Sequence, residues 1–519
     1  MPFWAKLPRK DGDGMDPKDK QIQYLTALVE TLNATIKELQ ETVKGSQETI
    51  KALEETIKEL QETVKSSQET IKELRRQLGQ DSHNSSKPPS SDGYKKPPRT
   101  RSQRTPSGKK PGGQKGHKGA NMSIPHAPDE FRSHFPEKCL TCPHLSECLE
   151  NKSVFKCGEK RYTVEAEVIT KVIEHRSLKV DICPCGETPG AGAFPEDVKA
   201  YVQYGSSVTV LVGLLSTYGA MSAMRIHTLI GGLLGVCLSP GTVVSMVRKC
   251  AKKVGPIMKM IKELIENGDV GHFDETGARL GGGLYWVHNS STSKYTYQTI
   301  SKKRGKVGID ANGVLPNFHG VAMHDCWSPY WKYDGLLHAI CNAHLLRELT
   351  GIEDFEPDHT WAFSFKALLR AMKKAKDRAV AKGKSGLSPS YLAKFSREYD
   401  LIMAVAEEEC PEPPDLPRKK RGKKKKGKER ALIERLIKLK DAVCLFIRDF
   451  KVPFDNNQAE RDVRNVKTKV KVAGCFRSEG GAQNYLDVMS FLSTGMKHQI
   501  SVFDALTAAF ADNAEIVLQ

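Results

Sequence analysis

The sequence predicts a multidomain α+β protein, and three features of its 519 residues carry this prediction. A heptad repeat near the N-terminus is typical of a coiled coil, and a cluster of cysteines indicates a small zinc-finger-like module. Short strand-like segments with acidic residues then lie between two helical regions, which indicates an α/β core with a helical insertion. We therefore expect several separate folding units.

The first predicted unit is a parallel coiled coil over residues 17–79. Residues 35–55 recur almost unchanged at 56–76, and a repeat of 21 residues is three heptads. β-branched residues occupy one core position and leucines the other, which favours two parallel strands. Ser46 and Ser67 interrupt the leucine position and should weaken the seam. We expect a homo-oligomer, a dimer joined through this helix.

A basic, disordered linker is predicted over residues 80–122, because its Pro, Ser, Gly and Lys content leaves too little apolar surface to fold. Residues 80–120 hold ten Lys or Arg against two Asp, and the basic tract 418–430 holds ten against one Glu. These two segments account for nearly all of the net charge of +18. Because basic segments attract polyphosphates, DNA is an expected partner.

Residues 123–190 form the predicted zinc-finger-like module, which includes a strand-like segment at 161–180. A structural zinc site takes four ligands in a tetrahedron. The six candidate ligands are Cys139, Cys142, Cys148, Cys157, Cys183 and Cys185. In one arrangement, the zinc ligands are Cys139, Cys142, Cys148 and Cys157. In the other, Cys139 and Cys142 bind the ion together with Cys183 and Cys185. Both arrangements predict a structural Zn²⁺ ion.

Residues 195–265 are predicted to be helical, because their apolar residues recur at helical spacing. Leu238–Thr242 indicates a turn with an N-cap serine and a proline at the first helical position. Such a helix–turn–helix can enter a major groove, and it can equally be a hairpin that only packs in the core. We assign this region to DNA binding.

The catalytic core is predicted over residues 266–345 and 450–515. Three strand-like segments at 268–276, 283–291 and 294–301 precede a Gly/Lys-rich segment and a further apolar run that ends at Asp325. Three strands, a helix and a fourth strand is the order of a ribonuclease-H-like sheet. The first and fourth strands of such a sheet are neighbours, so Asp274 should lie beside Asp325.

Asp274, Asp325 and Glu460 are the candidate catalytic residues. Carboxylates that converge can hold two Mg²⁺ or Mn²⁺ ions for phosphoryl transfer, although they lie far apart in sequence. Glu460 is predicted to share a helical face with Arg464 and Lys467, where cations can meet a phosphate backbone. Of the nearby acids, Asp455 is predicted to cap the start of this helix. Asp462 is predicted to point away from the face that carries Glu460.

Glu460 follows Asp325 by 135 positions, which exceeds one strand–helix connection, so a helical insertion is predicted over 346–449 with the basic tract 418–430 inside it. Trp327 and Trp331 are predicted to be core aromatics, with stacking on an unpaired base as the alternative.

From Asp81 onward the chain resembles the bacterial insertion-sequence transposases of the TnpC type, insertion sequence family sixty-six. The segments that carry the resemblance, in chain order, are DSHNSSKPPSSD, GGQKGHKG, LSPGT, FDET, HDCWSPYW, CNAHLLREL, and NNQAERDVRNVK through GCFRSEGGA. The most specific are FDET, CNAH and NNQAER. The resemblance implies that Asp274, Asp325 and Glu460 form an aspartate–aspartate–glutamate triad that binds Mg²⁺.

The resemblance implies an enzyme that cuts the ends of an insertion sequence and joins the 3′-OH to target DNA. Its DNA partners would be the element ends and the target, and small accessory proteins of the same element are possible further partners. The Cys-x-x-His pair of CNAH, Cys341 and His344, is expected to pack near the active site on one helical face. Candidate contacts to DNA phosphates are Arg461, Arg464, Lys467, Lys469, Lys471 and Arg477.

Two alternatives share the same sequence features. One is a catalytically silent DNA-binding regulator derived from a transposase, and the other is a structure-specific nuclease on the same fold. The polar first twenty residues predict no signal peptide, and the most apolar stretches are too short to span a bilayer. We expect a cytoplasmic, nucleoid-associated protein without membrane contacts.

Overall fold

The computed structural model describes residues 16–81, 84–85, 127–150, 160–164, 168–180, 184–185, 190–412 and 427–519. Cys157, Cys183, nearly all of the predicted linker and most of the basic tract 418–430 lie outside these ranges. The chain divides into two compact units, Met1–Lys87 and Pro88–Gln519. None of the helices in the described ranges combines the length and apolar character that a bilayer span needs.

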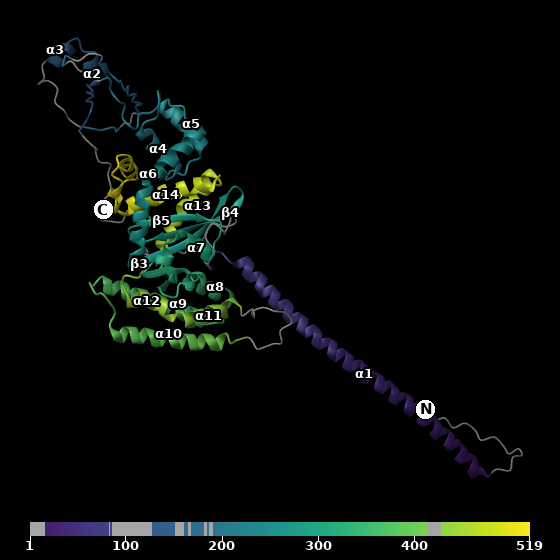
Figure 1. Cartoon of the computed structure of the whole chain (residues 1–519). Helices are drawn as coiled ribbons and strands as arrows, with labels where there is room; N and C mark the ends of the chain where they lie inside the picture. Colours follow the sequence, from purple (N-terminus) through teal and green to yellow (C-terminus); the bar gives the residue numbers. More distant parts are fainter. Residues whose placement is uncertain are drawn as a thin grey trace. The chain divides into compact units, whose positions relative to one another are not determined.

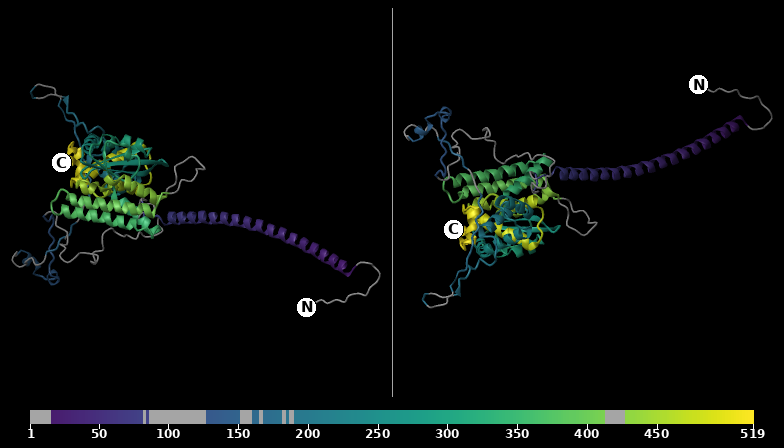
Figure 2. Two further views of the ribbon diagram at one scale, coloured as in Figure 1. Left: turned by 90° about the horizontal axis from the view of Figure 1, so that it is seen from below. Right: turned by 90° about the horizontal axis from the view of Figure 1, so that it is seen from above.

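The first unit is dominated by helix α1, Pro17–Gly79. Its 63 residues form one continuous, gently curved rod of about 95 Å, which Figure 2 shows in two views. Asp16 caps its start by accepting a hydrogen bond from the backbone N–H of Lys18. The apolar core positions of the heptads are all exposed on the single chain, as Ile50 and Leu53 illustrate at 56% each.

The cysteine-containing segment has little regular structure in its described part. It contains helices α2, Glu137–Leu140, and α3, Leu145–Glu150, and the short paired strands β1, Lys179–Val180, and β2, Gly190–Ala191. Among the described residues of the strand-like segment predicted at 161–180, the strand is therefore limited to the last two, Lys179 and Val180. Ile169 and Val172 are 80% and 89% exposed, so no described part of the chain covers these apolar side chains.

Three helices follow: α4, Ser206–Ser216, α5, Ala223–Leu234, and α6, Pro240–Glu266. The predicted turn before α6 is confirmed, because Ser239 Oγ accepts a hydrogen bond from Thr242 N at 3.0 Å and Pro240 is the first helical residue. A small apolar cluster, which includes Ile226 and Val243, joins α4, α5 and the start of α6. The remainder of α6 belongs to the core of the following sheet.

The sheet has five strands in the order β5-β4-β3-β6-β7. The bounds are β3, Val270–Leu280, β4, Gly283–Ser291, β5, Thr296–Ser301, β6, Val321–His324, and β7, Leu337–Ile340. β3, β4 and β5 form an antiparallel meander, whereas β3, β6 and β7 run parallel. The predicted adjacency of the first and fourth strands of this sheet is therefore confirmed.

Two hydrophobic cores flank this sheet. One contains α6 and the C-terminal helices α14 and α15 packed on the meander, and the other joins β6 and β7 to the inserted helices α8–α12. The inserted helices are α8, Asn342–Phe355, α9, Trp361–Val380, α10, Pro389–Glu409, α11, Lys428–Lys438, and α12, Lys440–Arg448. The remaining elements are α7, Lys306–Asn312, α13, Asn457–Ala473, α14, Glu479–Lys497, α15, Val502–Phe510, and the short 3-10 helices η2, Leu315–Asn317, η3, Tyr330–Lys332, and η4, Ala514–Leu518. Figure 1 shows α13 and α14 apart from the stacked helices α9, α10, α11 and α12.

Candidate active site

The two candidate aspartates lie at neighbouring positions on adjacent parallel strands. β3 pairs with β6 in a register that sets His272 beside Met323. Two residues further along, the same register brings Asp274 level with Asp325, which directly follows the last residue of β6. β6 is buried along its whole length, as a central parallel strand requires. The structure therefore brings these two acids together.

A glycine permits the close approach of the two strands. Gly320 directly precedes β6, and a Cβ at this position would lie 2.3 Å from the carbonyl oxygen of Gly268 and 2.5 Å from that of Asp269. Both oxygens belong to the chain that enters β3. Because backbone atoms cannot move aside as a flexible side chain can, only glycine fits where the two strands begin.

The carboxylates of the site repel one another. Burial raises the pKa of Asp274 well above its ordinary value, and the negative charges of Glu275, Asp325 and Glu460 raise it further. Burial also raises the pKa of Asp325, with Glu275 as the next cause. Acids that are crowded and desolvated in this way favour a bound cation, which offsets their charge.

Glu460 reaches the aspartates from a different element, the first turn of α13. Its Oε1 lies 3.9 Å from His344 Nε2 and 3.7 Å from Arg347 Nη2, and it has no hydrogen-bond partner among the described residues. A buried carboxylate oxygen without a hydrogen bond is costly even beside a cation, so this atom is suited to accept a metal ion. The negative charge of Glu460 contributes to the raised pKa of Asp274. The three candidate carboxylates are therefore close enough for their charges to interact.

The two competing acids near Glu460 are engaged elsewhere. Asp455 accepts a hydrogen bond from the backbone N–H of Asn457 at 3.1 Å, just before α13. Asp462 is buried and forms an ion pair with Lys497 at 3.0 Å. Both placements agree with the expectation that Asp455 acts at the helix start and that Asp462 faces another way.

Asn456 attaches the start of α13 to the strand that carries Asp274. Its Nδ2 donates to the carbonyl oxygen of Phe273 at 2.8 Å, and its Oδ1 lies 2.8 Å from His272 Nδ1. Since Nδ2 is the donor, Oδ1 must accept, so His272 carries its proton on Nδ1. The backbone N–H of Asn456 donates to Cys341 Sγ at 3.1 Å. These contacts fix the distance between Glu460 and the aspartates.

Replacing Asn456 with Ala should destabilise the fold by about 2–4 kcal/mol, because two buried polar groups lose their partner. It should also lower catalytic activity, since the first turn of α13 loses its attachment to β3. Chemical denaturation of the folded chain measures the first effect. Asn457→Ala is the matched control, because Asn457 is exposed. Equal stability of the two variants would contradict this role for Asn456.

A fourth buried acid, Glu275, supports the site and was not singled out in the sequence. Its side chain is 2% exposed, and Arg304 Nη2 and Tyr330 OH each donate to it at 2.6 Å. The guanidinium of Arg304 lies between the rings of Trp286 and Trp327, 4.6 and 4.1 Å from their centroids. In the sequence, the one local sign of a role for Glu275 is its position next to Asp274 in FDET. Its partners, Arg304 and Tyr330, lie 29 and 55 residues further along the chain.

This arrangement bears on the two tryptophans of the segment HDCWSPYW. Trp327 packs on Arg304, and Trp331 packs on His338 with 4.8 Å between ring centroids. Both rings therefore have partners inside the protein, in agreement with the prediction of core aromatics.

Cys341 and His344 lie beside Glu460, although not on one helical face. Cys341 is the N-cap residue of α8, and His344 is in the first turn of that helix. Burial raises the pKa of the Cys341 thiol to about 12. Burial lowers the pKa of His344, and the charge of Arg347 contributes to this shift. Both shifts favour the uncharged form of the side chain.

The six candidate DNA-binding residues fall into two groups. Lys467 donates to the carbonyl oxygen of Gly277 at 2.9 Å. Lys469 donates to two carbonyl oxygens, including that of Ser216, and burial lowers its pKa to about 8. Because these two lysines have partners inside the protein, they connect α13 to other elements. The exposed members of the set are Arg461, Arg464, Lys471 and Arg477.

The described zinc candidates are Cys139, Cys142, Cys148 and Cys185, in or near α2, α3 and the β1–β2 turn. Within the described ranges, the one group of three or more Cys, His, Asp or Glu residues with ligand atoms close together is Cys341, His344 and Glu460. With Cys157 and Cys183 outside those ranges, the zinc module stays a prediction.

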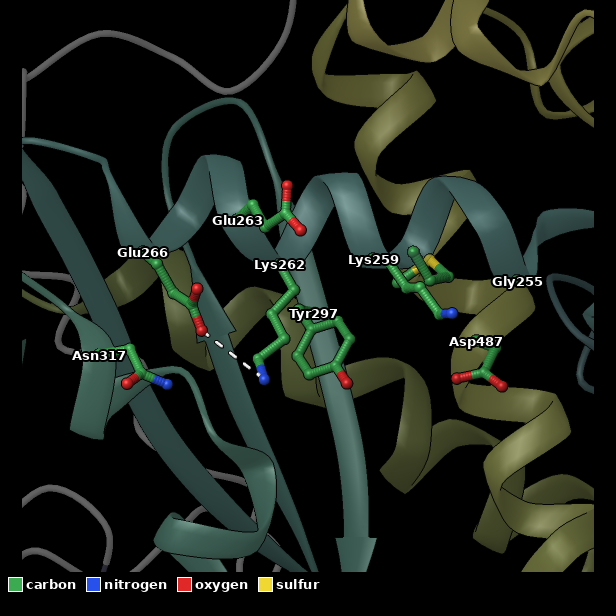
Figure 3. Close-up of a pocket in the computed structure, with 9 residues that line it drawn as sticks. Gly255, Lys259, Lys262, Glu263, Glu266, Tyr297, Asn317 and Asp487 are labelled. Atoms are coloured by element: carbon green, nitrogen blue, oxygen red, sulfur yellow. Dashed lines mark ion pairs between the residues drawn. The ribbon is translucent and has the colours of Figure 1, made fainter.

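A surface cavity of about 410 Å³ lies between α6, β5 and α14, and Figure 3 shows its lining. Its charged side chains are two lysines and three acids: Lys259, Lys262, Glu263, Glu266 and Asp487. Lys262 lies 3.6 Å from Glu266 as an ion pair. This lining carries no positive excess that would attract DNA phosphates, and it contains none of the candidate site residues.

Comparison with known protein families matches two parts of the chain. A family model described as "Transposase IS66 family" matches residues 202–484, which is more than half of the chain and contains all three candidate acids. A second, described as "Family of unknown function (DUF6444)", matches residues 14–123. No curated protein matches the chain.

Proposed function

Because the chain belongs to the IS66 family of transposases, we propose that it cleaves the ends of an insertion sequence and joins the freed 3′-OH to target DNA. Membership in the family identifies a transposase, an enzyme that acts on DNA, and it confirms the resemblance noted in the sequence. The proposal adds the chemistry of the two steps and the residues that perform them.

Asp274, Asp325 and Glu460 are proposed to hold two Mg²⁺ or Mn²⁺ ions. The donor set fits these ions, because all three side chains offer carboxylate oxygens and Oε1 of Glu460 has no hydrogen-bond partner among the described residues. Two bound ions would activate the attacking oxygen and stabilise the leaving oxygen. The observation that carries the proposal is the parallel register of β3 and β6, which aligns Asp274 with Asp325.

The strand order supports assignment of the core to the ribonuclease-H-like folds. Three antiparallel strands precede helix α7, and the next strand, β6, returns parallel to the first. In the proposed first step, the oxygen of water attacks the phosphorus at the element end, the P–O3′ bond breaks, and the 3′ oxygen takes up a proton. In the second step, that 3′-OH attacks a target phosphate and displaces the adjoining 3′ oxygen of the target.

Other parts of the chain are proposed to hold the DNA. The exposed cations Arg461, Arg464, Lys471 and Arg477 lie on or just after α13, the helix that carries Glu460. Phosphate contacts from these positions would place a DNA strand beside the carboxylates. Helices α4–α6, the linker 80–122, the basic tract and a structural Zn²⁺ held by the module 123–190 are proposed to engage the element ends.

A strand-transfer assay tests this function. The full chain is incubated with a labelled oligonucleotide of its own element end and a supercoiled plasmid, with Mg²⁺ or with EDTA. We expect a labelled plasmid only when Mg²⁺ or Mn²⁺ is present. A parallel reaction adds the companion proteins of the same element. DNA retention without cleavage in both reactions would favour the silent regulator, and cleavage without joining would favour the structure-specific nuclease.

Helix α1 is proposed to pair two copies of the chain, so that both element ends are processed together. Exposed apolar residues follow one another every seven residues from Ile36 to Ile71, through both copies of the three-heptad repeat. Burying them against an identical helix would remove them from water. Ile50 and Ile57 occupy the same heptad position in the two repeats.

Replacing both Ile50 and Ile57 with Lys should convert the dimer to a monomer, because four charges would face one another in the seam. Light scattering coupled to size-exclusion chromatography measures the mass of each form. Replacing the exposed Lys51 and Lys58, one residue further along, with Gln is the matched control and should leave the dimer intact. A wild-type monomer at micromolar concentration would refute the proposed pairing.

A further inference from the structure

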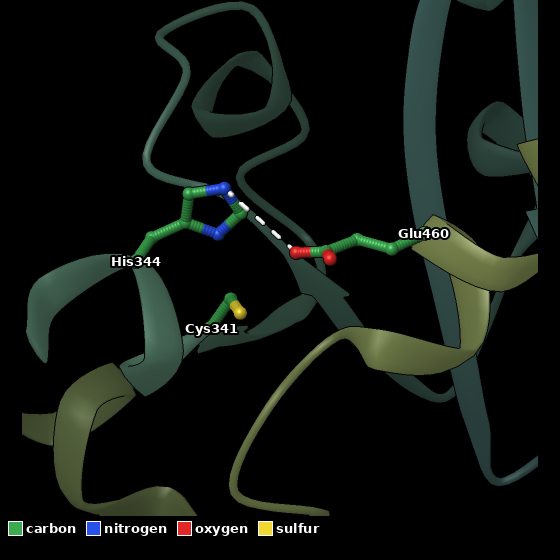
Figure 4. Close-up of side chains that lie close together, drawn as sticks. All are labelled: Cys341, His344 and Glu460. Carbon is green, nitrogen blue, oxygen red and sulfur yellow. Dashed lines mark ion pairs between the residues drawn. The ribbon is translucent and has the colours of Figure 1, made fainter. Parts of the chain in front are cut away.

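The side chains of Cys341, His344 and Glu460 converge at the point where α8 and α13 begin. One ligand atom from each residue lies within 4.8 Å of the other two, and His344 Nε2 is 3.9 Å from Glu460 Oε1. Figure 4 shows the thiol and the imidazole on one side and the carboxylate reaching toward them from α13. Sulfur, nitrogen and oxygen thus face a common space.

These three donors differ in kind from those that Mg²⁺ selects. Mg²⁺ takes oxygen ligands, whereas Zn²⁺ binds thiolate, imidazole and carboxylate together. Zinc bonds of about 2.0–2.3 Å set neighbouring ligand atoms of a tetrahedral site roughly 3.3–3.8 Å apart. The separations of up to 4.8 Å between the three donors exceed this range by about 1 Å at most, so a small closure of the cluster would suit zinc.

Two buried atoms of the cluster have no hydrogen-bond partner within the described part of the chain. They are Glu460 Oε1 and His344 Nδ1. Buried polar atoms are ordinarily paired, so the unpaired Glu460 oxygen indicates a missing ligand, for which either ring nitrogen of His344 could supply a second bond. The third donor is oriented already, because the backbone N–H of Asn456 points at Cys341 Sγ from 3.1 Å. This N–H would also stabilise a thiolate.

One neighbouring cation opposes metal binding. Arg347 Nη2 lies 3.7 Å from the same Glu460 oxygen. Its side chain is 24% exposed, so the guanidinium can move toward solvent or to the other carboxylate oxygen when a metal ion takes Oε1. Burial lowers the pKa of His344, which favours the neutral imidazole, the form of histidine that binds metal ions.

We infer that Cys341, His344 and Glu460 form a binding site for Zn²⁺ or another thiophilic divalent cation, and that this cation competes with Mg²⁺ for Glu460. Binding forms the metal–sulfur, metal–nitrogen and metal–oxygen bonds, and the Cys341 thiol releases its proton to solvent. A water molecule completes the fourth position. Occupancy would turn Glu460 away from Asp274 and Asp325. Binding itself is independent of the proposed function, whereas the competition rests on it.

Equilibrium dialysis of the full chain against Zn²⁺ tests the binding. Cysteines of the predicted zinc module are also expected to bind zinc, so the site is measured by difference. We expect Cys341→Ala to bind one equivalent less than wild type, and Cys444→Ala, which removes another buried thiol, to bind as wild type does. Glu460→Gln should weaken the same equivalent at least tenfold. Equal stoichiometry in wild type and Cys341→Ala would overturn the inference.

The absorbance of the Cd²⁺-loaded protein provides a second measurement of metal binding that does not depend on DNA joining. A metal–thiolate band should be smaller by one sulfur in Cys341→Ser than in Cys444→Ser, and circular dichroism verifies that both variants are folded. The competition is then measured as Zn²⁺ inhibition of Mg²⁺-dependent joining, each protein normalised to its own zinc-free rate. We expect Cys341→Ser to need at least tenfold more Zn²⁺ for half inhibition.

The two readings separate failure of this inference from failure of the proposed function. If no form of the protein joins DNA while Cys341-dependent zinc binding is present, the site stands and the strand-transfer chemistry fails. If joining is present and both variants bind and respond to zinc equally, the inference fails and the function stands.

Discussion

Replacing Glu460 with Gln lowers Mg²⁺-dependent cleavage and joining by roughly 10²–10³-fold or more, while DNA binding persists. Glutamine keeps the shape of the side chain and removes the negative charge that a metal ion needs. Metal-ion stabilisation of a phosphoryl transition state contributes several kcal/mol, and each 1.36 kcal/mol is a factor of ten in rate. The strand-transfer assay measures the loss, and gel retardation with the same oligonucleotide measures binding.

The matched control is Glu263→Gln on α6, which removes the charge of an exposed glutamate. It should leave joining at the wild-type rate. If joining survives in Glu460→Gln, the third metal ligand is another acid. Glu275 is then the nearest remaining candidate, because it is buried beside Asp274 and Asp325 and its charge raises the pKa of both.

The second large effect is on stability. Replacing Asp462 with Asn should destabilise the fold by about 3–5 kcal/mol, because the Lys497 ammonium is left buried without a countercharge. The two side chains are 6% and 10% exposed, and their atoms lie 3.0 Å apart. Lys497 Nζ also lies near acceptors on Thr292, Tyr295 and Thr296, but these are neutral. Urea denaturation of wild type and variant measures the difference.

A surface pair of the same type is the control for Asp462. Lys253 and Asp512 lie 2.6 Å apart, with Asp512 83% exposed, so Asp512→Asn should have a far smaller effect. Combining Asp462→Asn with Lys497→Met removes both charges and should recover part of the lost stability. If Asp462→Asn alone were as stable as wild type, Lys497 would be neutral or would find another partner.

The predictions that followed from local pattern agree with the structure. The heptad repeat predicts one helix over 17–79, and α1 spans that range. The cap at Ser239 and the alternation of strand-like segments depend on neighbouring residues alone. The segment at 161–180 shows the limit of such patterns, because a strand also needs a partner for its backbone hydrogen bonds. Among the described residues of this segment, two are paired, Lys179 and Val180.

The supporting contacts of the site could not be predicted in this way. Asn456 and His272 are 184 residues apart, and Lys469 reaches a carbonyl 253 residues away. A lysine in a basic stretch of sequence has the same neighbours whether its side chain contacts DNA or donates to the end of another helix of the same chain. The sequence alone therefore does not separate these two roles. Only the packing of α13 against α4 distinguishes these two positions of Lys469.

The sequence by itself determined most types of element and their order, and it singled out the three acids as candidates, because periodicity, capping and motif are properties of neighbouring residues. The tertiary structure alone decided which groups meet. It set Asp274 beside Asp325 through strand register, held Glu460 near them through Asn456, and placed Cys341 and His344 around the same carboxylate. Side chains from distant segments meet only when the burial of a shared apolar core fixes the strands and helices that carry them.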